Sequence, residues 1–165
     1  MALQLVSQES HTGCFIACVA MLLGKTYKET FSLFYPGKNA DVMYSHGFRE
    51  MSMEGAAHRL LGGLGFKSRT SKYKKFRTYQ NRITKHTIMI IRWKFDPTMC
   101  HCVLFDADTK SFIEPDGGYI ITDRWTLKHL ERQLECGIVI EETPVLNSGT
   151  PSDIYRSPDP FGLAW

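Results

Sequence analysis

The chain has 165 residues, of which 43% are hydrophobic, and its formal net charge at pH 7 is +3. This supplies enough apolar material for one hydrophobic core, so we expect a single domain. No apolar run approaches the roughly eighteen residues that span a bilayer, and the N-terminus lacks the pattern of a secretory signal, so we expect a soluble, cytoplasmic protein with no membrane span.

Cysteine usage gives a second indication of the compartment. There are five cysteines, an odd number, in a chain long enough to fold without disulfide bonds. A reducing environment with free thiols is the natural interpretation. The cysteines are Cys14, Cys18, Cys100, Cys102 and Cys136.

The segment from Gln8 to Leu22 contains the strongest candidate for a catalytic residue. Cys14 stands where an apolar helical run begins, six positions after Gln8. Unpaired backbone N–H groups and the helix dipole at such a position favour thiolate over thiol, which makes Cys14 a candidate nucleophile. The same N–H groups and the Gln8 amide could bind an oxyanion. The alternative is that Cys14 is a small core residue.

The first half of the chain predicts helices and one strand. An extended arm or short strand over Ala2–Val6 precedes a buried helix that Gly24 ends, and Thr26 caps a second helix through Phe34. An irregular loop over Lys38–Met51 leads to a third helix, capped by Ser52 and ending near Leu61. A strand over Phe66–Arg69 follows.

The second half predicts an antiparallel sheet. The β-branched run Thr87–Trp93 reads as a central strand covered on both faces, and three shorter strands and a turn follow it. Asp123 caps a helix carrying Leu127, Leu130 and Leu134, before a last strand. The shorter strands are His101–Asp106, Ser111–Pro115 and Tyr119–Thr122, and the last strand is Ile138–Ile140. The fold class is therefore α+β, with residues 1–143 as the domain and 144–165 as a flexible or surface-draped tail.

Positive charge is concentrated in the middle of the chain. Between Gly55 and Lys94 there are eleven of the twenty lysines and arginines and no acidic residue, so the block over residues 67–85 could meet an acidic partner. Within it, Lys72–Lys85 alternates basic and aromatic residues, a composition that can bind single-stranded nucleic acid. Because no nucleic-acid-binding motif accompanies the charge, we expect the rings to pack inward and predict no nucleic-acid partner.

His101 is the candidate base for Cys14. It opens an apolar strand that is followed by a hairpin and an acidic turn, an order in which one hairpin can supply both a base and the residue that orients it. A turn at Asp108-Thr109 would place Asp116 directly opposite His101, whereas Glu114 would reach it diagonally on the same face. Both acids are candidates for the third catalytic residue.

Two motifs together carry a family resemblance. Gln8, Cys14, Ala17-Cys18 and Ala20-Met21, then His101-Cys102-Val103 and Glu114-Pro115 with glycine soon after, resemble the papain-like cysteine peptidases that process bacteriocins and other double-glycine leader peptides. The resemblance covers about Gln8 to Glu141. It implies a papain-like fold, with a helical lobe packed on an antiparallel sheet.

The resemblance also implies the roles of the site residues. Cys14 would be the nucleophile, Gln8 the oxyanion donor, His101 the base and Glu114, the residue before proline, the third member in preference to Asp116. A peptide or protein cleaved after Gly-Gly would be the substrate.

The residues also fit other functions. A zinc site on the cysteines is one alternative, but strand alternation sends Cys100 and Cys102 to one face and His101 to the other. We therefore expect a metal site and a Cys14–His101 pair to exclude each other, and predict neither metal nor cofactor. A non-catalytic relative that binds a partner and a cell-wall amidase are the remaining alternatives.

Overall fold

A computed structural model describes residues 3–10, 13–37, 53–72, 80–93 and 99–145. The predicted loop over Lys38–Met51, the Ser52 cap, residues 73–79 of the basic and aromatic stretch and residues 146–165 of the predicted tail lie outside the described residues.

The described part of the chain is α+β, as predicted. It contains a six-stranded sheet in the order β1-β6-β2-β3-β4-β5, and every pairing is antiparallel. The strands are β1 (Lys67–Ser71), β2 (Thr87–Arg92), β3 (Cys100–Asp106), β4 (Ser111–Glu114), β5 (Tyr119–Ile121) and β6 (Leu134–Glu142). The helices are α1 (Cys14–Leu23), α2 (Tyr27–Phe34), α3 (Met53–Gly63) and α5 (Arg124–Gln133), with a short 3-10 helix, η1 (Gln80–Arg82).

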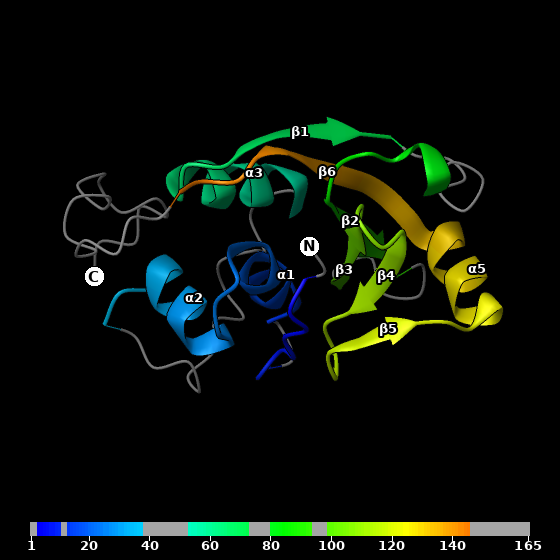
Figure 1. The fold of residues 1–165 in the computed structure, drawn as a ribbon, viewed down its shortest axis with the longest axis horizontal. Coiled ribbons are helices and arrows are strands. Elements are labelled where there is room, and N and C mark those ends of the chain that lie inside the picture. Colours follow the sequence, from blue (N-terminus) through cyan, green and yellow to red (C-terminus); the bar gives the residue numbers. More distant parts are fainter. Residues whose placement is uncertain (1–2, 11–12, 38–52, 73–79, 94–98, 146–165) are drawn as a thin grey trace.

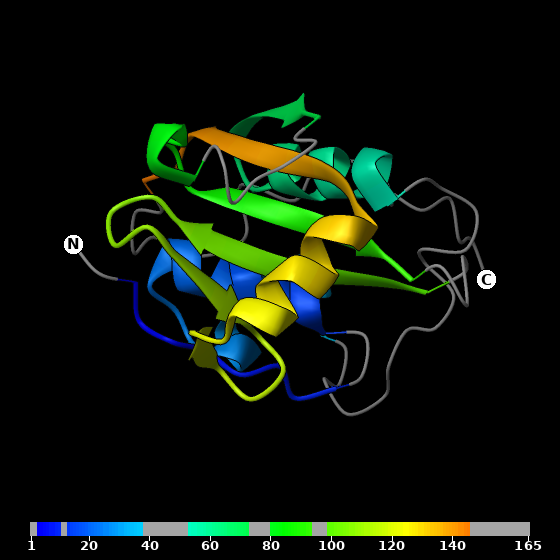
Figure 2. The same ribbon diagram turned by 90° about the vertical axis from the view of Figure 1, so that its right-hand side faces the viewer.

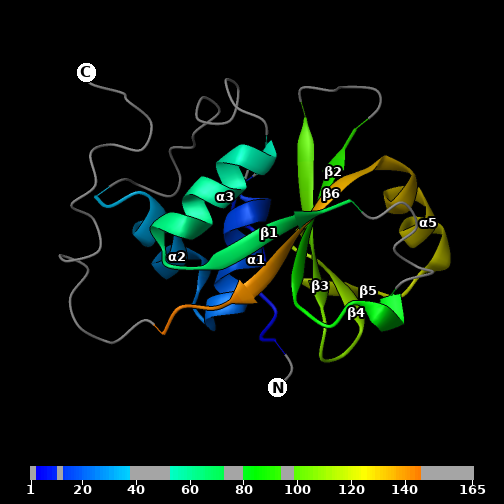
Figure 3. The same cartoon turned by 90° about the horizontal axis from the view of Figure 1, so that it is seen from above.

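The helices lie on two sides of the sheet. α1, α2 and α3 are on one side and α5 is on the other (Figures 1 and 3). Side chains alternate accordingly along the central strands: Ile88 and Ile90 of β2 belong to the core on the α1 side, and Met89 and Ile91 to the core on the α5 side. The prediction that this strand is covered on both faces is confirmed.

α1 is the buried helix that the sequence predicts. Its residues from Cys14 to Leu22 are all buried, which explains why its apolar side chains surround the helix instead of forming one stripe. Gly24 ends it in the left-handed conformation, with φ 63°, which glycine adopts at no steric cost.

α2 packs against α1 and also begins as predicted. The Thr26 side chain accepts a hydrogen bond from the Glu29 backbone N–H while the Glu29 carboxylate accepts one from the Thr26 N–H, forming a capping box. Phe34 lies 6.1 Å from Phe15 of α1, measured between ring centroids. This contact fixes α2 beside α1.

The main differences from prediction lie at the C-terminal end of the domain. Leu134 was expected on the helix, but its backbone is extended, with ψ 122°, and it begins β6 directly after α5. β6 is longer than the predicted Ile138–Ile140 because it pairs with both β1 and β2. Within the described residues, no helix has both the length and the apolar character needed to cross a membrane.

Candidate active site

The start of α1 is held by close packing against α2. The N-cap of α1 is Gly13, and a Cβ there would lie 2.2 Å from the Tyr27 hydroxyl oxygen, so any other residue would have to displace the Tyr27 side chain. The Tyr27 hydroxyl is also 3.2 Å from Ser10 Oγ, and the Gly13 N–H donates to the Ser10 carbonyl. Because Gly13 has no side chain, it makes no capping hydrogen bond to the first-turn N–H groups beside Cys14.

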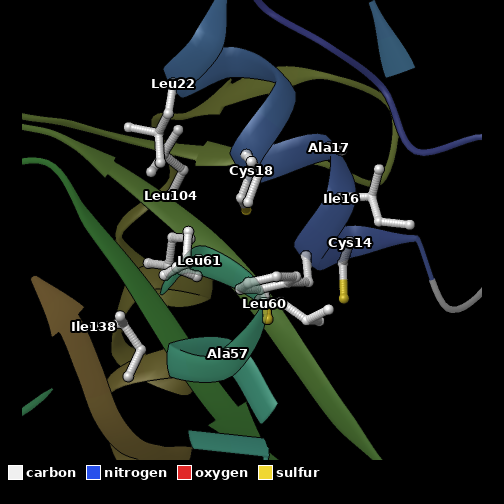
Figure 4. Packing of buried hydrophobic residues seen from close by; sticks show 14 of the residues in the cluster. Cys14, Ile16, Ala17, Cys18, Leu22, Ala57, Leu60, Leu61, Leu104 and Ile138 are labelled. Atoms are coloured by element: carbon white, nitrogen blue, oxygen red, sulfur yellow. The ribbon is translucent and has the colours of Figure 1, made fainter. Parts of the chain in front are cut away.

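Cys14 is a buried thiol in the first turn of α1, 5% exposed and in the same core cluster as Leu60 of α3 (Figure 4). A hydrogen bond from the Cys102 thiol lowers the pKa of Cys14, burial raises it, and a hydrogen bond and the charge of His101 lower it further, to about 5. The sulfur is therefore a thiolate at pH 7.

His101 lies at the start of β3 and contacts both Cys14 and Glu114. Its Nε2 atom is 2.7 Å from Oε1 of Glu114. Burial opposes the charged ring, but hydrogen bonds to Cys14 and Glu114 outweigh it and raise the pKa of His101 to about 10. Because Nε2 is engaged by the carboxylate, Nδ1 is the nitrogen left to face the sulfur. The pair is a thiolate and an imidazolium at neutral pH.

The hairpin register explains how Glu114 reaches His101. β3 and β4 pair Leu104 with Ile113 and Asp106 with Ser111, so continuing the register places Asp116 opposite His101. Asp116 is nevertheless exposed, and its backbone N–H donates to Glu114 Oε1 at 3.0 Å. The carboxylate beside the imidazole is that of Glu114, and Asp116 contributes only its main chain to it.

Gln8 is brought to the site by the loop after β4. Its backbone N–H donates to the Pro115 carbonyl at 2.7 Å. The same loop approaches the arm closely at Gly118, which has φ 63° and where a Cβ would lie 3.1 Å from the Ser7 nitrogen. The Oε1 atom of Gln8 is buried without a hydrogen-bond partner among the described residues. The main chain of Gln8 is thus held beside the loop that follows β4, and its side-chain oxygen, a hydrogen-bond acceptor, has no partner among the described residues.

The expectation that strand alternation keeps Cys102 and His101 from facing Cys14 together is wrong. Cys102 and Leu104 face α1, as alternation requires, and Val103 faces α5, yet both Cys102 and His101 hydrogen-bond to Cys14. His101 lies beyond the last β3–β4 pair, at the end of the strand where β4 no longer pairs with β3. From this position its ring reaches Cys14 at the start of α1. The contact between Cys14 and Cys102 was not anticipated for this reason.

A metal site at these cysteines does not follow from their proximity. Among the described residues, the group whose potential ligand atoms all lie within 4.8 Å of one another is His86, Asp106 and Asp108. It sits at the other end of β3 from His101. The Asp106 carboxylate there accepts hydrogen bonds from the Asp108 N–H and the Thr109 hydroxyl, so the turn between β3 and β4 accounts for it.

An aromatic neighbour of His101 was also missed by sequence reasoning. Trp93, just after β2, stacks on the imidazole with 6.4 Å between ring centroids and 29° between planes. The ring centroid of His129 on α5 lies 6.2 Å from that of Trp93. Trp93 follows Ile91, the β2 partner of His101, on the same face, so the available signal was an aromatic residue ending the strand beside the histidine.

Comparison of the chain with known proteins gives no match to a family model, a curated protein or a solved structure. The geometry of the site joins a thiolate, an imidazolium and a carboxylate in series at the N-terminus of a helix. Such an arrangement can perform nucleophilic acyl transfer.

Proposed function

We propose that this protein is a cysteine peptidase that hydrolyses an amide bond in a peptide or protein through Cys14, His101 and Glu114. The observation that supports it best is the hydrogen-bonded series from the Cys14 sulfur through the His101 ring to the Glu114 carboxylate. A merely structural cysteine in an apolar core has a raised pKa, as burial gives Cys18, whereas that of Cys14 is lowered to about 5.

In the acylation step, the Cys14 thiolate attacks the carbonyl carbon and the carbonyl π electrons move onto oxygen. The first-turn N–H groups of α1 and the Gln8 side-chain amide stabilise that oxyanion. When the tetrahedral intermediate collapses, the C–N bond breaks and the His101 imidazolium gives its proton to the leaving nitrogen. An amine departs and a thioester to Cys14 remains.

In the deacylation step, neutral His101 removes a proton from water as the water oxygen attacks the thioester carbon. The second tetrahedral intermediate expels the Cys14 thiolate and releases a carboxylic acid. Glu114 keeps the ring oriented and stabilises its positive charge in both steps, which is the role of the third member in such triads. The thiolate and imidazolium are regenerated.

The proposed fold is papain-like. A nucleophile at the head of a buried helix, packed on an antiparallel sheet whose strand supplies the histidine, supports this proposal. Within that proposal, the resemblance of the two motifs makes peptides with Gly-Gly before the scissile bond the first substrates to try. A partner-binding protein without activity would not need the series of three charged groups.

A cleavage screen tests the proposal. Wild type and Cys14→Ala are incubated with a defined peptide library that includes Gly-Gly sequences, and the products are identified by mass spectrometry. We expect cleavage by wild type only, with the new N-termini sharing a sequence preference. Cleavage by both proteins, or by neither, would contradict the proposal.

Alkylation tests the reactive thiolate separately from any substrate. We expect iodoacetamide to modify Cys14 selectively, with a rate that rises through a midpoint near pH 5, and His101→Ala to move this midpoint upward. Cys100→Ala is the matched control, since burial raises the pKa of that thiol and its removal leaves the labelling unchanged. Equal labelling of several cysteines would argue against an activated nucleophile.

A further inference from the structure

The outer side of α5 presents an unusually exposed aromatic ring. Trp125 is 73% exposed, more than Tyr119 at 51%. Its backbone is nevertheless fixed, because the Trp125 N–H donates to the Asp123 cap at 2.9 Å. Its ring lies 5.5 Å from His129, one helical turn later, and nearly parallel to it at 8°. A pre-ordered ring open to solvent is suited to stacking on another planar group.

Trp125 is the outer end of a row of rings that leads to the active site. His129 lies 6.2 Å from Trp93, and Trp93 lies 6.4 Å from His101. The His129 ring is held in place by Gln133, whose Nε2 is 2.6 Å from His129 Nε2. We call Trp93, His129 and Trp125 the aromatic row. It is a continuous path along the surface from the general acid to α5.

The chemistry of the proposed reaction decides which half of a substrate follows this path. His101 protonates the leaving nitrogen, so the amine half of the substrate must pass beside its ring. The acyl half stays bonded to Cys14 and has its carbonyl oxygen at Gln8 and the helix start. The aromatic row therefore lies on the amine side, C-terminal to the scissile bond.

Two cations share the outer face of α5 with the rings. Lys128 and Arg132 follow Trp125 at three and seven positions, which places them on the same helical face, and both are exposed. Leu130 points the other way, into the core on that side of the sheet. In Figure 2, α5 lies in front of the sheet with its outer side uncovered by other described elements. This face offers stacking and positive charge together.

We propose that the aromatic row and the outer face of α5 bind the segment C-terminal to the scissile bond, and prefer an aromatic side chain followed by an acidic one. The aromatic side chain stacks on Trp125 and the carboxylate pairs with Lys128 or Arg132. An extended peptide advances about 3.3 Å per residue, so three ring-to-ring steps correspond to at most about five residues. The proposal rests on the proposed function, because the direction of the peptide follows from the role of His101.

Peptide binding tests this surface without requiring turnover. The peptides are labelled with fluorescein and have Gly-Gly before the scissile bond. After that bond, each carries one tyrosine followed directly by one glutamate, and the pair is placed at different positions between the second and the fifth residue. Binding to the Cys14→Ala protein is measured by fluorescence anisotropy. We expect at least one register to bind more tightly than its serine and glutamine counterpart. Adding Trp125→Ala lowers the affinity for that peptide roughly three- to tenfold and leaves the affinity for the counterpart unchanged.

Charge variants and two further readouts complete the test. Replacing both Lys128 and Arg132 by glutamine removes the advantage of the glutamate, whereas Lys28→Gln on α2, across the sheet, does not. Three outcomes would overturn the proposal. Trp125→Ala could leave the binding of every peptide unchanged, or it could weaken peptides with and without tyrosine equally. The protein could also bind a single-stranded oligonucleotide in a Trp125-dependent way and bind no peptide. Cleavage is scored separately with wild type: Trp125-dependent peptide binding without cleavage supports the surface and rejects the hydrolase.

Discussion

The Nε2 atom of His101 lies 2.7 Å from Oε1 of Glu114, although these residues are not directly opposite each other in the β3–β4 hairpin. The continued register places Asp116 opposite His101, and the longer glutamate side chain reaches the ring diagonally from the same face. The same oxygen accepts the Asp116 backbone N–H at 3.0 Å. The carboxylate is therefore held by its own loop in the position that fixes the imidazole.

Replacing Glu114 by glutamine should slow the reaction and change its pH dependence. The amide keeps the shape of the side chain but removes the charge that helps to raise the pKa of His101. We expect kcat to fall by roughly a hundredfold or more, and the alkaline limb of the pH–rate profile to move below pH 10. Asp116→Asn is the control and should leave both unchanged; the reverse order of effects would make Asp116 the orienting acid.

The Cys102 thiol should tune the nucleophile. Its hydrogen bond is the largest cause lowering the pKa of Cys14, so Cys102→Ala should move the midpoint of iodoacetamide labelling upward by about one pH unit or more. Cys102→Ser, which retains a donor, should restore part of the shift. Cys18→Ala deletes an equally buried thiol of the same cluster and should move the midpoint less. Identical midpoints in the Cys102→Ala and Cys18→Ala proteins would show that burial alone controls the pKa.

Local signals in the sequence predict most of the fold. Thr26 and Asp123 cap helices because their side chains bond to first-turn N–H groups, and this depends only on neighbouring residues. Gly24 ends α1 for an equally local reason. The start of β6 was missed because the helical spacing of Leu130 and Leu134 continues past the helix, and pairing with β2 overrides it.

The candidate site is predictable only where the argument is local or follows a simple register. Gln8, Cys14, His101 and Glu114 could be proposed from motifs, and the hairpin register correctly indicates that Glu114 can reach His101 diagonally. The contact of Cys14 with Cys102 could not be predicted in this way. Alternation puts Cys102 and His101 on opposite faces, so a His101 that faces Cys14 was expected to leave Cys102 facing away. His101 lies at the end of the strand, however, and reaches Cys14 as well as Cys102 does. Trp93 and α5 join the site through tertiary packing, which no local pattern encodes.

Gln8 should act on the oxyanion and not on the thiolate. We expect Gln8→Ala to lower kcat by roughly a hundred- to a thousandfold, since it removes a donor to the developing charge. Alkylation of Cys14 by iodoacetamide forms no such oxyanion and should keep its rate and pH dependence. Ser7→Ala is the control, because the Ser7 hydroxyl bonds only weakly to the Gln8 carbonyl at 3.3 Å. A parallel loss of alkylation would instead mean that the arm simply holds α1 in place.

Cys14 and His101 together predict a stability plateau around neutral pH. The pKa of Cys14 is lowered from 9.0 to about 5, so its contribution is present above pH 9.0 and is lost as the pH falls to about 5. The pKa of His101 is raised from 6.5 to about 10, so its contribution is present below pH 6.5 and is lost as the pH rises to about 10. Between pH 6.5 and 9.0 the gain from one offsets the loss from the other.

Outside that window only one of the two contributions changes. The unfolding free energy should rise by about 1.4 kcal/mol per pH unit from pH 5 to 6.5, where the unfolded chain binds one proton more than the folded pair, and should fall at the same slope from pH 9.0 to 10. Urea denaturation across this pH range would measure this change as the difference in unfolding free energy between wild type and the Cys14→Ala, His101→Ala double variant. Cys100→Ala is the control and should follow wild type. A difference that is constant from pH 5 to 10 would mean that the two side chains do not form an ion pair in the folded protein.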